Sequence, residues 1–207
     1  MSGRKARQMT EPPEEVPPAE QTQHLRQLLT ERDVKAFNAT HKTTRKGRPE
    51  FSLDLAGIKL TGADLKRINL EMANLAGAEV LRINFAGANL KRTSFAGAKL
   101  TNVNFAGADL KASNFGGAKL TNVNFAGADL SWIELSGVNL TGCLFSWAKL
   151  TGAILQRANL AGADFTGADF AAADLAGARI TGADLTGAKI NKWTKGLTVQ
   201  QLGDITK

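Results

Sequence analysis

The chain has 207 residues, of which 43% are hydrophobic and 22% are charged, and its formal net charge is +7. No stretch approaches the roughly twenty consecutive apolar residues of a membrane-spanning helix, and a single cysteine excludes a disulfide-stapled fold. The basic start of the chain lacks an apolar segment, so we expect no secretory signal and a cytoplasmic protein.

The charge is spread along the chain. Residues 1–50 hold ten Lys/Arg against seven Asp/Glu, residues 51–190 thirteen against eleven, and residues 191–207 three against one. The central segment is therefore close to neutral, which argues against a dedicated polyelectrolyte surface. Residues 1–20 are polar and contain four of the five prolines, a composition that predicts disorder.

Residues 21–50 are predicted to form a helical cap and a basic linker. Apolar residues at helical spacing favour a helix from His24 to about His41, with Thr30 as a helix N-cap. We expect this helix to cover the open edge of the element that follows it. The linker at 42–48, KTTRKGR, is interpreted as a solvated connector, with contact to nucleic acid or anionic lipid as the alternative.

A five-residue repeat fills residues 51–190. Every fifth position from Leu55 to Ile190 is Leu, Phe, Ile or Val, and the position two residues earlier is always small or apolar. Gly occupies sixteen of the twenty-seven positions that lie two residues later. A period of five fits neither a helix nor a strand. It predicts a chain that buries two residues and then turns a corner, where Gly supplies the unusual backbone angles.

A longer period of twenty residues indicates how the repeats stack. The sequence GAKLTNVNFAGADL occurs at 97–110 and again, letter for letter, at 117–130. Phenylalanine also recurs every twenty residues, at Phe85, Phe105, Phe125, Phe145 and Phe165. Four pentapeptides therefore make one square coil, and the twenty-eight repeats make seven. At roughly 4.8 Å between stacked strands, we expect a rod about 34 Å long.

These residues resemble the pentapeptide-repeat proteins, whose loose pattern A(D/N)LxG stands here as ADLTG at 183–187, ADFTG at 163–167 and ANLAG at 73–77. The resemblance covers residues 51–190 and implies an all-β fold, a right-handed quadrilateral β-helix with Leu/Phe and Ala ladders inside. Some members resemble duplex DNA in width and charge and protect type II topoisomerases such as DNA gyrase from inhibitors. Those members tend to be strongly acidic, and this chain departs from them because its repeats carry more Lys/Arg than Asp/Glu.

The repeats offer no chemistry for catalysis. They contain no His and no Tyr, and a rod filled with Leu, Phe and Ala has no cleft, so we expect no enzyme, no catalytic residue and no cofactor. Cys143 stands at an inward small position and is interpreted as a buried spacer. The outward carboxylates offer too few oxygens for calcium on a flat face, so no metal site is predicted. Those carboxylates are Asp109, Asp129, Asp164, Asp169, Asp174 and Asp184.

Four apolar residues break the repeat pattern and are the candidate interaction residues. Trp132 and Trp147 replace Gly at corners, while Leu144 and Ile154 take outward positions that are normally polar. They predict two small apolar patches on different corners, and exposed aromatic residues on a polar rod are typical of a protein interface. The alternative is that each large corner side chain folds back along its own face.

A basic column is the candidate anion-binding surface. Lys59, Lys99, Lys119 and Arg179 share one face, but Glu79, Asn139 and Asn159 interrupt them. We expect a solvated surface, with weak anion binding as the alternative, because nucleic-acid sites show contiguous basic stripes.

The repeat is expected to stop at 191–193, and residues 191–207 are expected to form a C-terminal cap with a short helix. Its apolar residues would cover the last coil or form the contact of a homodimer. They are Trp193, Leu197, Val199, Leu202 and Ile205.

The leading functional hypothesis is a rigid rod that binds an as yet unidentified protein partner. Gyrase binding by DNA mimicry is one alternative. Binding of nucleic acid or an anionic membrane surface through residues 1–50 is the other, and it predicts a steep dependence on salt.

Overall fold

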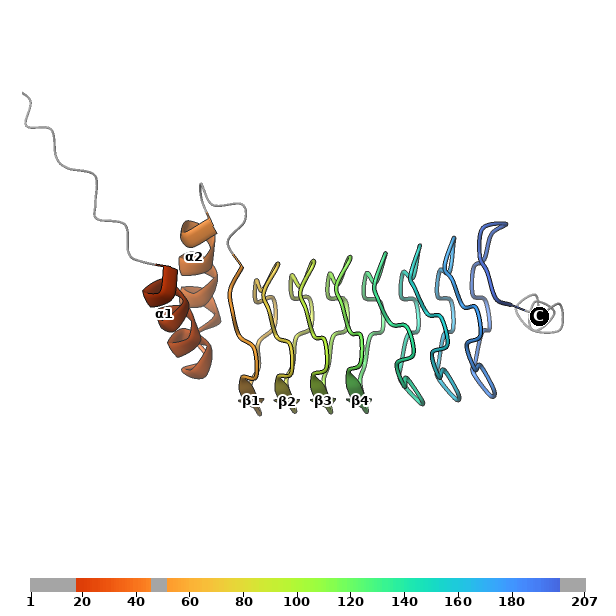
Figure 1. Cartoon of the computed structure of the whole chain (residues 1–207), viewed down its shortest axis with the longest axis horizontal. Coiled ribbons are helices and arrows are strands. Elements are labelled where there is room, and N and C mark those ends of the chain that lie inside the picture. The colour runs from red at the N-terminus through yellow and green to blue at the C-terminus, as the bar shows by residue number, and fades with distance from the viewer. Residues whose placement is uncertain (1–17, 46–51, 198–207) are drawn as a thin grey trace, which may run out of the picture.

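The computed structural model describes residues 18–45 and 52–197, which form a rod with two helices at one end (Figure 1). The helices are α1 (Pro18–Thr30) and α2 (Val34–Arg45). The repeats form a right-handed quadrilateral β-helix whose coils stack along the long axis. No helix within these ranges is both long and apolar enough to cross a membrane.

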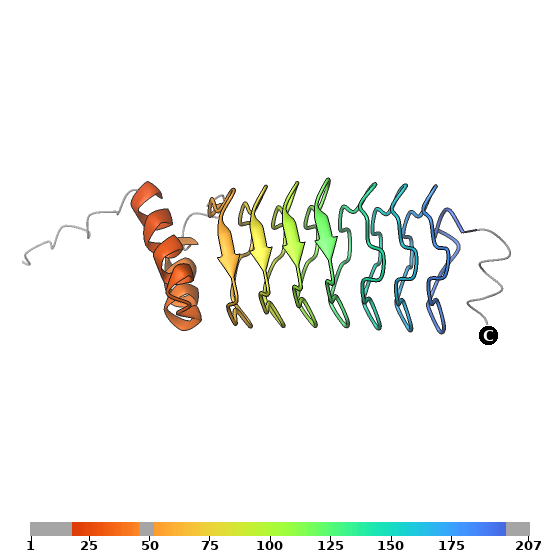
Figure 2. The same ribbon diagram turned by 90° about the horizontal axis from the view of Figure 1, so that it is seen from below.

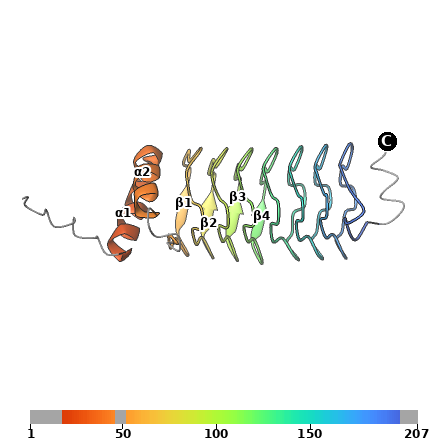
Figure 3. The same cartoon turned by 90° about the horizontal axis from the view of Figure 1, so that it is seen from above.

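Each coil is hydrogen-bonded to the next in a register of twenty residues. On one face the pairing produces four short parallel strands, in the order β1-β2-β3-β4 (Figures 2 and 3). Their bounds are β1 Lys59–Thr61, β2 Glu79–Leu81, β3 Lys99–Thr101 and β4 Lys119–Thr121. The Lys59↔Glu79 and Glu79↔Lys99 pairs set the register on this face, and bridges of the same spacing link the other three.

We name the four faces by their outward columns. Face A carries Lys59, Glu79, Lys99, Lys119, Asn139, Asn159 and Arg179. Face B carries Asp64, Asn84, Asn104, Asn124, Leu144, Asp164 and Asp184. Face C carries Asn69, Asn89, Asp109, Asp129, Lys149, Asp169 and Lys189. Face D carries Asp54, Asn74, Ser94, Asn114, Glu134, Ile154 and Asp174.

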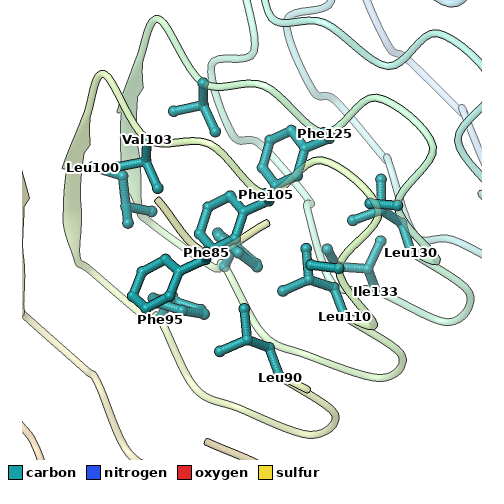
Figure 4. Packing of buried hydrophobic residues seen from close by; sticks show 14 of the residues in the cluster. Phe85, Leu90, Phe95, Leu100, Val103, Phe105, Leu110, Phe125, Leu130 and Ile133 are labelled. Carbon is teal, nitrogen blue, oxygen red and sulfur yellow. The ribbon is translucent and has the colours of Figure 1, made fainter. Parts of the chain in front are cut away.

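The interior consists of stacked ladders of apolar residues, with runs of Phe or Leu in the same column (Figure 4). Phe105 is fully buried, and its ring centroid lies 5.4 Å from that of Phe85 and 5.2 Å from that of Phe125, with nearly parallel planes. Such aromatic pairs stabilise a core by about 0.5–1.5 kcal/mol beyond the area that they bury. Two inward polar residues are satisfied: the Thr93 hydroxyl donates to the Leu70 carbonyl (2.8 Å) and the Ser113 hydroxyl to the Leu110 carbonyl (2.7 Å).

Every corner of the coil has a positive φ, whatever residue occupies it. The sixteen corner glycines have φ between 61° and 70°, and eleven other residues hold the same conformation at 52° to 61°. The left-handed region costs a residue with a side chain about 1–2 kcal/mol, so the inter-coil ladder enforces it at those eleven corners. The outward Asp or Asn before the corner also stabilises the turn. Its side-chain oxygen accepts the backbone N–H two residues later, as Asp164 does from Thr166 (2.9 Å).

The two helices lie against the first coil and bond to its backbone. Leu25, Leu29 and Phe37 belong to the same buried cluster as the rod interior. Arg26 Nε donates to the Asp54 carbonyl (3.0 Å). Asn38 bonds twice, as its Nδ2 donates to the Arg67 carbonyl (3.0 Å) and its Oδ1 accepts the Asn69 N–H (2.7 Å). These backbone groups would otherwise be an unpaired sheet edge.

The boundaries of this helical region differ from the sequence prediction. The first helix begins at Pro18, so the segment predicted to be disordered is helical from residue 18 to residue 20; residues 1–17 lie outside the described ranges. The second helix continues to Arg45, so the predicted linker is helical over 42–45, and residues 46–51 are not described.

The predicted N-cap at Thr30 is wrong. Thr30 is the last residue of α1, and its hydroxyl donates to the Arg26 carbonyl (2.9 Å). The N-cap of α2 is Asp33, whose Oδ1 accepts the Ala36 N–H (2.9 Å). Between them Arg32 takes a left-handed φ of 64° and ends α1, a role usually filled by Gly, so the sequence carries no ordinary stop signal there.

The ladder also continues past the predicted stop at 191–193. Lys195 pairs with Asp174, one residue later than the twenty-residue register. Asn191 Oδ1 accepts the Ala172 N–H (3.0 Å), and the Thr194 hydroxyl donates to the Phe170 carbonyl (2.8 Å). These polar side chains therefore satisfy backbone groups of the last coil.

The apolar residues predicted to cover the last coil are only partly described. Trp193 is 61% exposed, with Lys192 Nζ 4.7 Å from its ring centroid, so it does not cover that coil. Leu197 is half-buried against the core. Val199, Leu202 and Ile205 lie outside the described residues.

The helix cap can be tested by alanine substitution. We expect Asp33→Ala to lower the free energy of unfolding by about 1 kcal/mol, because α2 loses its N-cap acceptor. Thr30→Ala removes only a bond within α1 and is expected to cost less than half as much. The measurement is the denaturant midpoint of both variants; an equal or larger loss for Thr30→Ala would contradict the assignment.

Candidate interaction surface

The two corner tryptophans lie flat on the glycine of the next coil. A Cβ built on Gly152 would lie 2.5, 2.6 and 2.8 Å from Cε3, Cζ3 and Cδ2 of Trp132. Three adjacent ring atoms can be so nearly equidistant from one point only if that point lies over the ring face. Trp147 covers Gly167 in the same way, with its three nearest ring atoms at 2.6 to 2.9 Å.

This placement follows a rule of the coil. The corner side chain of Arg67 also reaches over the glycine twenty residues later, with Cγ 3.6 Å from a Cβ built on Gly87, and Arg157 does so over Gly177 at 3.5 Å. A large corner residue therefore folds along the rod axis onto the next coil rather than along its own face. Its sequence signal is a large residue at a corner followed by Gly twenty residues later.

Folding back does not bury the indoles. Trp132 is 64% exposed and Trp147 is 71% exposed, although each packs one ring face on glycine. The rings therefore do not fold back along their own faces, as the alternative interpretation of the sequence expected; they lie on the next coil, and their outer faces stay in solvent.

The two corners border the same face. On one coil, the chain crosses face C from the corner at Trp147 to the corner at Gly152, and Gly152 lies under the Trp132 ring. The two rings therefore lie at opposite edges of face C. Five residues separate these corners, which is at most about 17 Å of extended chain. Leu144 (45% exposed) lies beside one edge on face B, and Ile154 (37% exposed) beside the other on face D.

Between the two edges lies a column of alternating charge: Asp129, Lys149 and Asp169. Burial opposes ionisation of Asp129, but hydrogen bonds from Ser131 (2.6 Å) and Lys111 (3.0 Å) outweigh it and lower the pKa of this carboxyl. Asp169 Oδ1 accepts the Ala171 N–H (2.9 Å). Its carboxylate makes no ion pair with any described residue.

The charges are partitioned along the rod. Among the described residues, all ion pairs between side chains lie between Lys59 and Asp129, for example Lys91–Asp109 at 3.2 Å. Residues 51–120 hold nine Lys/Arg against five Asp/Glu, whereas residues 121–190 hold four against six. This difference is visible in the sequence when charged residues are counted separately in the two halves. It is not visible in the total for the repeats, where the charges nearly cancel.

The main cause that lowers the pKa of two carboxylates in the acidic half, Asp164 and Asp174, is a hydrogen bond from a neutral donor. A hydrogen bond from the Ser146 hydroxyl is the main cause that lowers the pKa of Asp164. Gln156 Nε2 (2.8 Å) does the same for Asp174. These donors carry no charge, and neither carboxylate makes an ion pair with a Lys or Arg among the described residues.

The basic column on face A is interrupted by an acid. Glu79 lies between Lys99 and Lys59, each 3.3 Å away, and these two bonds lower its pKa. The shallow groove here, of about 350 Å³, is thus lined by an ion-paired triad. Lys119 follows Lys99, but two asparagines separate it from Arg179, so the four candidate cations share a face without forming a continuous stripe.

The described residues provide no metal-binding cluster of three or more His, Cys, Asp or Glu side chains. Cys143 is buried, and burial raises the pKa of its thiol to about 11. It occupies the inward position that Ala fills elsewhere.

A family model of pentapeptide repeats matches the chain in eight copies between residues 54 and 191. Among curated proteins none matches. Several solved structures are similar at low identity, among them QnrB1, HetL and Rfr23. QnrB1, a plasmid-mediated fluoroquinolone resistance protein, is 17% identical (69% of this chain, 84% of that one, TM-score 0.44). HetL of Nostoc sp. strain PCC 7120, involved in heterocyst differentiation regulation, is 24% identical (72% and 92%, TM-score 0.32). Rfr23 of Cyanothece 51142 is 22% identical (77% and 99%, TM-score 0.25).

The packing of Trp132 can be tested with two matched glycines. Gly142 and Gly152 have φ of 65° and 66°, but a Cβ on Gly142 meets nothing within 4 Å. We expect Gly142→Ala to cost about 1 kcal/mol of folding free energy from the left-handed backbone alone. Gly152→Ala should cost about 1–3 kcal/mol more, because the methyl group displaces the indole.

The control repeats both glycine substitutions in a protein that lacks the Trp132 ring. In a Trp132→Asn background the extra cost of Gly152→Ala should disappear. Equal denaturation midpoints for the two single variants would contradict the flat packing of the ring.

The burial of Cys143 can be tested through the reactivity of its thiol. Because Cys143 is buried and its pKa is raised to about 11, we expect no reaction with a thiol reagent in the native protein near neutral pH and full reaction after denaturation. Rapid modification of the native protein, followed by absorbance, would show that the site opens.

Proposed function

Since the chain belongs to the pentapeptide-repeat family, we propose that it is a non-enzymatic scaffold that binds a protein partner through Trp132, Trp147, Leu144 and Ile154. The observation that carries this proposal is the pair of indoles that rest on glycine and expose their outer faces. Tryptophan is enriched among the residues that dominate binding energy in protein interfaces.

The mechanism is rigid display. The backbone N–H of Trp132 donates to the Thr151 carbonyl (3.0 Å), and the backbone N–H of Trp147 donates to the Thr166 carbonyl (2.8 Å). The next coil therefore fixes the backbone at both corners. The glycines beneath then restrict the rings themselves. A partner that binds such side chains loses little free energy to ordering them. We further propose that the protein acts in the cytoplasm, where reducing conditions suit a single free cysteine.

The alternatives have less support. DNA mimicry at a topoisomerase requires a continuous acidic surface, but face A presents Lys99 and Lys119 beside Thr101 and Thr121. Nucleic-acid or membrane-surface binding requires a continuous basic surface, and the cations of face A are interrupted by Glu79, which pairs with Lys59 and Lys99. A homodimer through the C-terminal end would use Trp193, which is exposed.

A pull-down from nuclease-treated lysate tests the proposal. The baits are the intact protein, a variant with Asn at Trp132, Leu144, Trp147 and Ile154, and Trp193→Ser as a control with an exposed tryptophan removed elsewhere. Asn is chosen because the chain already holds it at equivalent positions, at the corner Asn122 (φ 52°) and at the outward Asn114 and Asn124.

We expect a partner that the intact protein and Trp193→Ser retain and that the four-residue variant loses by at least about tenfold, since two interface tryptophans commonly contribute more than 1.4 kcal/mol. Unchanged circular dichroism should show that the variant is folded. Equal recovery by all baits would sink the proposal. Loss with Trp193→Ser alone would move the contact to the C-terminal end, and recovery that depends on nucleic acid would indicate a different function.

A further inference from the structure

We propose that the tryptophan-edged part of face C and its flanks bind a basic segment of polypeptide, with arginine side chains stacked on the two indoles. This inference rests on the proposed function and adds the chemistry of the partner. It follows from two independent features, the open ring faces and the uncompensated carboxylates around them.

The ring faces suit a guanidinium group. An indole face carries negative quadrupole charge and attracts cations placed over it, and arginine does this more often than lysine because its planar group also stacks. Trp132 and Trp147 each turn one face to glycine and the other to solvent, so the outer faces are accessible platforms at the edges of face C.

Three carboxylates around these platforms make no ion pair with any described residue, whereas Asp129 in the same column is paired with Lys111. Asp169 lies between the two edges, Asp164 lies next to Leu144 on face B, and Glu134 lies next to Ile154 on face D. Each has one oxygen that accepts a backbone N–H two residues later, at 2.7 to 2.9 Å, and the second oxygen of Asp164 also accepts the Ser146 hydroxyl. None pairs with a Lys or Arg among the described residues, so the acid groups can accept charge-assisted bonds from a partner.

A polyanion fits this surface poorly. Stacking on aromatic side chains is also how proteins bind single-stranded nucleic acid, but those sites surround the aromatic residues with cations that contact phosphates. Here Lys149 is the one cation in the column between the rings, and it lies between Asp129 and Asp169. The phosphates of a stacked strand would face carboxylates, so charge complementarity favours a basic polypeptide.

Fluorescence anisotropy with labelled probes tests this inference on the full chain. The probes are an arginine-rich peptide, a lysine peptide of the same length and charge, a glutamate-rich peptide and an oligothymidylate. Three variants are compared with the natural sequence: Trp132→Asn with Trp147→Asn; Glu134→Gln with Asp164→Asn and Asp169→Asn; and a charge-matched control, Asp54→Asn with Asp64→Asn and Glu79→Gln.

We expect the arginine peptide to bind most tightly, to weaken at high salt, and to lose roughly tenfold in affinity with either of the first two variants, the change that about 1.4 kcal/mol produces. The control variant should bind as the natural sequence does. The arginine peptide should also elute the partner captured in the pull-down, and the glutamate peptide should not.

Three results would overturn the inference. One is equal binding of the arginine peptide by the natural protein and the acid-neutralised variant. The second is preferential binding of the glutamate peptide or the oligothymidylate. The third is no binding of any probe while the pull-down still finds a tryptophan-dependent partner. That last result would leave the interaction scaffold in place and reject only the basic chemistry of its partner.

Discussion

The structure depends on one constraint, the hydrogen bonding of each coil to the next with a spacing of twenty residues. Leu55, for example, donates its N–H to the Asn74 carbonyl at 2.7 Å, and the same link recurs along the rod. A square coil can close at twenty residues only if the backbone turns at every fifth position. The positive φ at all twenty-seven corners is therefore a consequence of the ladder, and it holds even at Trp132 and Arg157, where the residue itself disfavours it.

A ladder of this kind has two open ends, and the chain closes the two in different ways. At the first coil, Arg26 and Asn38 from a pair of helices bond to exposed backbone groups while leucines and Phe37 cover the core. At the last described coil, Asn191 and Thr194 supply single polar atoms to the backbone. The helices cover the first coil with several buried apolar residues, whereas in the described residues after the last repeat only Leu197 packs against the core.

Because the interior is fixed by the ladder, the outward positions are free to differ between the two halves of the rod. The first half pairs its charges with one another, as Lys91, Asp109 and Lys111 do. The second half leaves carboxylates unpaired around two exposed indoles. A rod whose total composition is close to neutral thus presents two chemically distinct surfaces, one of paired charges and one of carboxylates and exposed indoles.

The sequence by itself determined the repeat, the inward residues and the number of coils, since these follow from periods of five and twenty along the chain. It also identified the four apolar residues that break the pattern. The tertiary structure decided what depends on residues far apart in sequence: the N-cap at Asp33, the bonds of Asn191, and the placement of the Trp132 ring on Gly152. The physical reason is that a period fixes which residues share a column, while the direction of a side chain and the partner of a charge depend on the neighbouring coil.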